Sequence, residues 1–202
     1  MRSNDLKATR RGLLLTGLAA LAWPRAALAL TTAEATQLIE RVMSDTMTIV
    51  NSNASTAQAL TRFEQVFEKH ADVPVIARSV LGQPWRGASP AQQRAFSTAF
   101  RGYLARKYGR EFREFRGSRV EITRAVDQGN RGIVVSTVLT IPGSPPISVD
   151  WQVTDRSGQP KMFNLFIEGI SMLSTERSEV RAILEGHRND LNALIADLNR
   201  RG

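Results

Sequence analysis

The sequence predicts an α+β fold in which helices come first, an antiparallel meander of four strands follows, and two helices close the chain. Apolar residues recur at helical spacing up to about residue 115, then at every second residue after Gly117, and at helical spacing again from Val180. Apolar residues make up 42% of the 202 residues and charged residues 23%, as in ordinary globular proteins. A single domain over residues 30–202 accounts for this length.

Cap signals mark the first three helices. Thr31 and Glu34 have the spacing of a capping box, which places the start of the first helix there. Apolar residues at helical spacing predict a second helix from about Ser55. Asp72 caps a short third helix, and Gly82 ends it.

The fourth predicted helix begins with the strongest local signal. Ser89 is a favourable N-cap, Pro90 fits the first helical position, and Gln92 completes a capping box. The helix extends to about Phe115 and carries a broad apolar face made of Phe96, Phe100, Tyr103, Leu104, Tyr108, Phe112 and Phe115.

An arginine stripe lies beside that face. Arg106, Arg110 and Arg113 follow one another at i, i+4 and i+7, with Glu111 and Glu114 between them. The stripe is interpreted either as a solvated face with local ion pairs or as a docking surface for acidic membranes or protein partners.

Period-two patterning defines the sheet. Ile147 to Val153 alternate strictly between apolar and polar residues, which is typical of an antiparallel strand with one buried face. Clusters of Gly, Pro and Asn separate the predicted strands, which cover residues 118–126, 131–141, 147–154 and 161–168. Parts of several strands carry apolar residues on both faces of the sheet. Either helices cover both faces, or one face borders an interior pocket.

Two helices are predicted at the C-terminus. Val180, Ile183 and Leu184 mark the first, and Asn189 caps the second.

The N-terminus has the layout of an export signal. A basic segment ending in Arg10 and Arg11 precedes an apolar run over 12–23, and an A-x-A motif ends at Ala29. The run is well short of the roughly 20 residues that a membrane span requires. Residues 1–29 are therefore predicted to be a signal peptide, with cleavage between Ala29 and Leu30 and a periplasmic destination. The paired arginines favour the twin-arginine route, and general secretion is the alternative.

Charge and composition exclude several function classes. The net charge is +8, of which +4 belongs to residues 1–29, so the mature chain carries a net charge of +4. That charge is too small to indicate a nucleic-acid partner without a basic stripe interleaved with aromatics. The absence of cysteine excludes disulfides, zinc–thiolate sites and thiol catalysis.

Catalytic motifs are sparse. The two histidines, His70 and His187, are far apart and lie near predicted helix ends. The segment 169–173 begins like a nucleophile elbow but lacks its second glycine. No metal-binding or nucleotide-binding motif is present. The sequence therefore favours a protein that is not an enzyme and uses neither metal nor cofactor.

Several blocks in the mature chain resemble the MlaC family of periplasmic phospholipid shuttles, also known as toluene-tolerance proteins. Their order and spacing match over nearly the whole mature chain; they are Leu81-Gly82-Gln83-Pro84-Trp85, Ser89-Pro90-Ala91-Gln92-Gln93, Phe96 to Tyr108, Pro146 to Trp151, Phe163 to Met172, and Arg177. The chain departs from the family at Asn164, where aspartate is usual, and at Thr175-Glu176-Arg177, where a triplet such as Asn-Tyr-Arg is usual.

The resemblance implies a curved four-stranded sheet wrapped by helices around an apolar cavity for acyl chains. The cargo implied is a phospholipid or a related lipid such as a hopanoid. The implied partners are an inner-membrane lipid ABC transporter with its substrate-binding protein and an outer-membrane lipoprotein–porin complex. The residues expected to contact lipid are Trp85, Phe96, Phe100, Leu104, Tyr108, Val135, Leu139, Trp151, Leu165, Ile167 and Met172. A periplasmic adaptor without lipid and a hydrolase of unrecognised type are the alternatives.

Overall fold

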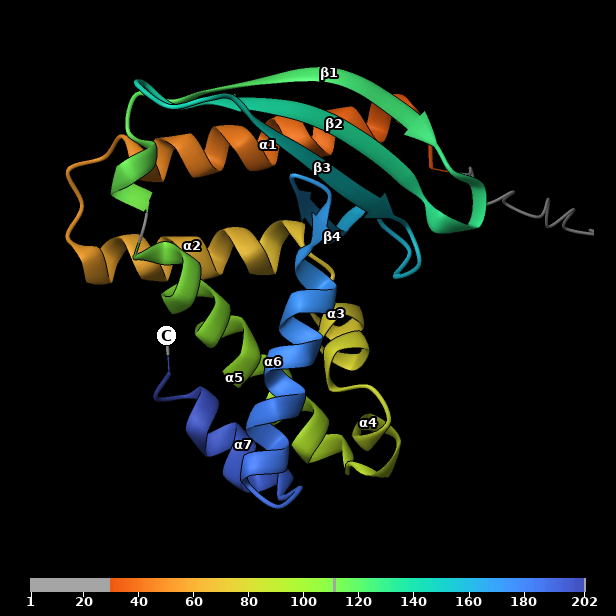
Figure 1. Ribbon diagram of the computed structural model, residues 1–202. Coiled ribbons are helices and arrows are strands. Elements are labelled where there is room, and N and C mark those ends of the chain that lie inside the picture. The colour runs from red at the N-terminus through yellow and green to blue at the C-terminus, as the bar shows by residue number, and fades with distance from the viewer. Residues whose placement is uncertain (1–29, 111, 202) are drawn as a thin grey trace, which may run out of the picture.

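Figure 1 shows the computed structural model of the chain, which describes residues 30–110 and 112–201. The predicted signal peptide, residues 1–29, which ends at Ala29, lies outside the described residues. The elements follow one another as helices, sheet and helices. Before the sheet come α1 (Thr32–Val50), α2 (Thr56–His70), α3 (Val73–Leu81), α4 (Pro84–Gly87), α5 (Pro90–Gly109) and the 3-10 helix η1 (Phe112–Phe115).

The sheet is an open antiparallel meander in which every strand pairs with the next in sequence, which confirms the predicted fold class. Its strands are β1 (Arg119–Asp127), β2 (Ile133–Thr140), β3 (Ile147–Thr154), β4 (Lys161–Ile167) and the two-residue β5 (Ile170–Ser171). The sequence predicted four strands. The fifth is a short return of β4, and Ile170 and Ser171 alone are too few to produce an alternating pattern. The chain ends with α6 (Met172–Gly186) and α7 (Leu191–Leu198).

Thr31, Asp72 and Ser89 cap their helices as predicted. Thr31, Ser55 and Ser89 each make both halves of a capping box, and Asp72 accepts a hydrogen bond from the backbone of Val75 at the start of α3. These bonds satisfy backbone N–H groups that the first turn of a helix leaves without partners.

Two helix boundaries correct the sequence-based prediction. The helix that starts at Pro90 ends at Gly109 and not at Phe115, because glycine is a poor helix former and the chain tightens into η1. The N-cap of α7 is Asp190 and not Asn189. Asn189 takes up a left-handed backbone conformation with φ 64°, while the Asp190 carboxylate accepts from Asn192 and Ala193.

The helices divide into two groups around the sheet (Figure 1). β1 to β3 arch over α1, and α2 runs below α1. α3, α5, α6 and α7 form a bundle below α2 and β4. Within residues 30–110 and 112–201, no helix combines the length and the hydropathy that crossing a membrane requires.

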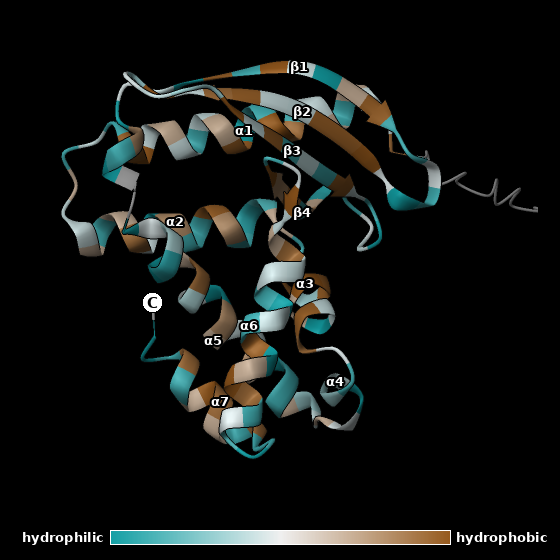
Figure 2. Cartoon of the chain, in the orientation of Figure 1, coloured by the Kyte–Doolittle hydropathy of each residue, from teal (hydrophilic) through white to brown (hydrophobic). Residues whose placement is uncertain are grey.

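The buried apolar residues form two separate clusters. The sheet core joins α1 to β2 and β3 and contains Ala35, Leu38, Ile39, Val42, Ile133, Val135 and Val153. The helical core joins α3, α5, α6 and α7, and its fully buried members include Phe96, Phe100, Val80, Val180, Leu194 and Leu198. Trp151 packs against both clusters. Figure 2 shows hydrophobic colouring along α1, α2 and the strands as well as within the bundle.

Candidate functional site

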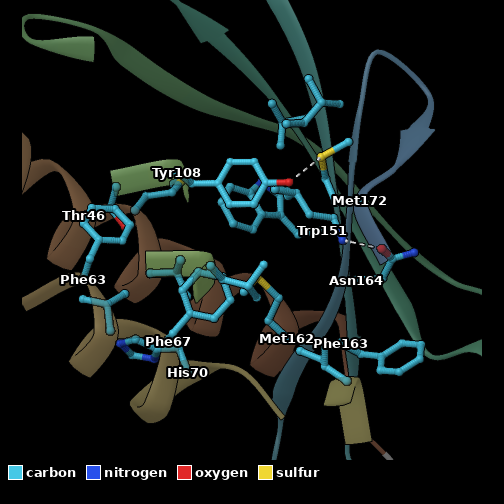
Figure 3. Close-up of a pocket in the computed structure, with 18 of the residues that line it drawn as sticks. Thr46, Phe63, Phe67, His70, Tyr108, Trp151, Met162, Phe163, Asn164 and Met172 are labelled. Atoms are coloured by element: carbon cyan, nitrogen blue, oxygen red, sulfur yellow. Dashed lines mark hydrogen bonds between the residues drawn. The ribbon is translucent and has the colours of Figure 1, made fainter. Parts of the chain in front are cut away.

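A cavity of about 400 Å³ separates the sheet core from the helical core. This volume lies within the roughly 300–1,000 Å³ that is usual for pockets that bind small molecules. Its walls come from every element between α1 and α6 except α4, β5 and the second 3-10 turn (Gly129–Arg131). Figure 3 shows side chains from the helices and from the strands pointing toward one another across the space.

The cavity wall is apolar almost throughout. Helices α1 and α2 supply an aliphatic and aromatic side, and strands β2 to β4 supply the opposite side. The polar or charged members of the wall are Thr46, His70, Thr137, Asn164 and Glu176. A wall of this composition favours a hydrocarbon ligand and leaves a few fixed polar groups to orient it.

Eight of the residues predicted to contact lipid line this cavity. They come from α5, from three strands and from the start of α6, and they are Phe100, Leu104, Tyr108, Leu139, Trp151, Leu165, Ile167 and Met172. The structure therefore brings these residues together, and their contact with lipid remains a proposal.

The other three predicted residues do not line this cavity. Phe96 is on the predicted face of α5 but one turn before Phe100, where it is fully buried in the helical core. Val135 is on the predicted face of β2, but α1 covers that end of the strand and Val135 belongs to the sheet core. Trp85 lies in α4 and packs against the helical core. In each case the apolar side chain predicted that the residue is buried, but it did not predict which other residues it contacts.

Sequence reasoning missed the whole of the wall contributed by α1 and α2. Met43 and Met47 on α1 and Phe67 on α2 are only partly buried within the protein and face the cavity. The one sequence signal for this wall is the broad apolar stripe of each helix. A broad stripe is equally typical of a helix packed against a sheet, so it does not indicate a cavity. The remaining wall residues that were missed are Val42, Thr46, Val50, Phe63, Val66, His70, Ile76, Val80, Phe115, Val120, Thr137, Val149, Met162, Phe163, Asn164, Leu173 and Glu176.

Two polar groups of the wall have their hydrogen bonds completed by the protein itself. The Trp151 indole N–H donates to Thr137 Oγ1 at 3.0 Å, and that hydroxyl donates to the carbonyl of Val149 at 2.9 Å. Asn164 Oδ1 accepts from the backbone N–H groups of Leu165 at 2.8 Å and Leu173 at 3.1 Å. These bonds fix the indole ring and join β4 to α6.

A network of tyrosines, a lysine and glutamates connects α5 to α6 beside the cavity. Lys107 Nζ lies 2.8 Å from Glu176 Oε1 and also contacts Glu179. The Tyr108 hydroxyl donates to Glu176 Oε1, and the Tyr103 hydroxyl donates to Glu179 at 2.6 Å. The network therefore holds the Glu176 side chain from the α5 side.

Burial and hydrogen bonding fix the protonation states of Lys107 and Tyr108 in this network. Burial, together with the bond to Glu176, raises the pKa of Tyr108 above its ordinary value. Burial by itself would lower the pKa of Lys107, but hydrogen bonds to Glu176 and Glu179 outweigh it and raise that pKa. Lys107 therefore stays a cation and Tyr108 stays a donor at neutral pH.

Each histidine is paired with a carboxylate. His70, which lines the cavity and is 3% exposed, has its Nε2 atom 2.7 Å from Asp45 Oδ2. His187 Nε2 lies 2.8 Å from Asp197 Oδ2 at the far end of the helical bundle. The hydrogen bonds from the histidines are the largest cause of a lowered pKa at both aspartates.

The arginine stripe is divided because α5 ends at Gly109. Arg106 is engaged at the end of α7, where its guanidinium donates to the carbonyls of Leu198 at 2.6 Å and Arg201 at 2.7 Å. Its guanidinium therefore caps carbonyls that a helix end leaves without partners. Arg110 and Arg113 are exposed and remain available for docking.

Two comparisons with known proteins bear on this geometry. A family model described as MlaC protein matches residues 40–200. A phospholipid-binding protein from Ralstonia solanacearum, solved in complex with a phospholipid, has a similar fold with a TM-score of 0.71 and 18% sequence identity. That match covers 83% of this chain and 96% of the other chain.

Proposed function

This chain belongs to the MlaC family, and from that membership and the geometry of the cavity we propose that it is a periplasmic lipid carrier without catalytic activity. The cargo is a phospholipid or a related lipid whose acyl chains occupy the cavity. The carrier moves this lipid between the inner and outer membranes and so maintains the lipid asymmetry of the outer membrane.

The observation that carries the proposal is the apolar cavity itself. Protein interiors are packed so closely that voids larger than a water molecule are few, and a void left in a core destabilises the fold. A space of about 400 Å³ between two well-packed cores is therefore not a by-product of folding. An adaptor that binds only proteins has no use for such a space, whereas a lipid carrier requires one.

The energetics of lipid transfer explain why apolar side chains suffice. Each methylene exposed to water costs about 0.8 kcal/mol, so an acyl chain of about 16 carbons left in water would cost on the order of 12 kcal/mol. A carrier must shield most of that surface. Side chains such as Leu104, Leu139 and Leu165 provide this shielding without any reactive group.

The cellular setting follows from the same proposal. Residues 1–29 would direct export, and Leu30 would be the first residue of the mature chain. The proposed partners are an inner-membrane lipid ABC transporter with its substrate-binding protein and an outer-membrane lipoprotein–porin complex. Exposed Arg110 and Arg113 support docking to anionic membranes or acidic partner surfaces, because surface charge accelerates association.

Lipid extraction tests the proposal. Protein recovered from the periplasm should begin at Leu30 by intact mass and should release roughly stoichiometric lipid into organic solvent. Delipidated protein should take up lipid from vesicles and deliver it to lipid-free acceptor vesicles, with the lipid unchanged. Protein that neither carries nor takes up lipid would contradict the proposal, and lysolipid produced in proportion to added protein would show an enzyme instead.

A further inference from the structure

Among the described residues of the cavity wall, Glu176 has a buried side-chain oxygen without a hydrogen-bond partner. The residue is 3% exposed, and its Oε1 atom accepts from Lys107 and Tyr108. Its Oε2 atom is buried and has no hydrogen-bond partner among the described residues. A buried carboxylate oxygen without a partner is costly, because it has lost its water without gaining a donor.

Position separates Glu176 from the other buried atoms that lack partners. Among the described residues these are oxygens of Asp72, Ser118, Ser136 and Thr154, and none of those residues lines the cavity. By contrast, Thr137 and Asn164 line the cavity and have their bonds completed within the protein. Of the buried side-chain oxygens that lack partners among the described residues, only Glu176 Oε2 belongs to a residue of the cavity wall.

The remaining neighbours do not supply the missing donor. Lys107 and Tyr108 both bind Oε1, and the raised pKa values of their side chains keep both groups protonated and in place. The wall around Glu176 is otherwise formed by residues such as Met172 and Leu173, which carry no strong side-chain donor. Because Glu176 lines the cavity, a molecule held there is a possible source of the donor that the described residues do not supply.

We propose that Glu176 Oε2 accepts a hydrogen bond from the cargo and selects lipids that carry a donor, either a primary ammonium or a hydroxyl group. This inference rests on the proposed function, because it concerns the polar part of a lipid held in the same cavity. A hydrogen bond to a charged acceptor is stronger than one between neutral groups. A group that only accepts hydrogen bonds would meet the carboxylate with nothing to donate, so the site discriminates by donor content.

Two pairs of lipids with identical acyl chains separate the two sources of the donor. Phosphatidylethanolamine has ammonium N–H donors, and phosphatidylcholine has none. Phosphatidylglycerol has two hydroxyl groups, and phosphatidylpropanol, with the same charge, has none. Delipidated mature protein is incubated with vesicles containing equal amounts of one pair, re-isolated and extracted, and the ratio of the two bound lipids is measured by mass spectrometry.

The variants assign any preference to the carboxylate. Glu176→Gln keeps the shape of the side chain and can retain Lys107 and Tyr108 through its carbonyl, which leaves an amide donor at the position of Oε2. Glu179→Gln is the matched control, because Glu179 also binds Lys107 but does not line the cavity. Glu176→Asp, which keeps the charge but shortens the side chain by one methylene, replaces Glu176→Gln if that variant does not fold.

The wild-type protein and Glu179→Gln should prefer the donor-bearing lipid of at least one pair by about tenfold, and Glu176→Gln should reduce the ratio to about one. Equal uptake of both lipids in both pairs by the wild type would overturn the inference and would indicate that water alone completes Glu176. A preference that survives in Glu176→Gln would overturn it as well. Failure to take up any of the four lipids would instead contradict the proposed function.

Discussion

The helical core and the cavity wall are built from the same kinds of side chain and often from the same helix. On α5, Phe96 is fully buried and stacks on Phe100, with ring centroids 5.7 Å apart. Two turns later Leu104 and Tyr108 lie on the wall of a cavity of about 400 Å³. The difference lies in what surrounds each turn, since Phe96 is enclosed by the helical core, whereas Leu104 and Tyr108 also border a space. The apolar character of a side chain therefore predicts that it is buried. The arrangement of the neighbouring elements determines whether it packs in a core or lines the cavity.

Truncating one leucine in the helical core and one on the cavity wall should give the largest difference in stability between the two regions. Leu194→Ala removes a fully buried side chain of the helical core and should destabilise the protein by about 2–5 kcal/mol. Leu139→Ala enlarges a cavity that already exists and should cost only about 1–2 kcal/mol. Urea unfolding of the delipidated proteins measures both values. Equal losses would mean that the wall is packed as tightly as the core.

Filling the cavity should separate binding from stability. Leu165→Trp adds volume on the cavity side of β4 and should lower lipid occupancy by about tenfold, while the free energy of unfolding changes by less than about 1.5 kcal/mol. Phe166→Trp, at the next position on the strand and off the cavity wall, is the matched control and should keep its lipid. Lipid extraction and urea unfolding of the same samples test the pair. The assignment of the wall would be wrong if both variants lost lipid equally.

Acid should reveal a smaller difference in stability between the two regions. Asp45 on the cavity side and Asp197 beside the helical core both have pKa values lowered in the folded state, first by the hydrogen bonds from His70 and His187. Each carboxylate therefore contributes stability above its ordinary pKa, and that contribution is lost as the pH falls below about 4. Because the Asp197 side chain is 13% exposed and that of Asp45 is 36% exposed, Asp197→Asn should reduce the acid dependence of unfolding more than Asp45→Asn.

Local signals predicted the elements well because their causes are local. The capping residues Thr31, Ser55 and Ser89 lie within three residues of the groups they bond, and the alternation along β3 directly reflects its two faces. The end of α5 at Gly109 was missed because a single glycine is often tolerated within a helix, so the tightening into η1 has only a weak local signal.

The candidate site was only partly predictable because contacts between segments distant in the sequence determine which residues line the cavity. The predicted faces of α5 and β2 were correct, yet Phe96 and Val135 lie under neighbouring helices that no local pattern reveals. The contribution of α1 and α2 was missed for the same reason. Glu176 could not be identified at all, because an acid at a helical position is normally exposed, and its burial depends on donors from α5.

The position of Trp151 gives the protein an intrinsic optical reporter. Of the three tryptophans, Trp23 lies in the predicted signal peptide, so the mature chain would keep Trp85 and Trp151. Only Trp151 borders the cavity, and its hydrogen bond to Thr137 holds the ring in a fixed orientation. Indole fluorescence responds to the polarity of its surroundings, so lipid that enters the cavity under the proposed function would shift the emission of Trp151 toward the blue. Loading and unloading can thus be followed in real time without attaching a dye.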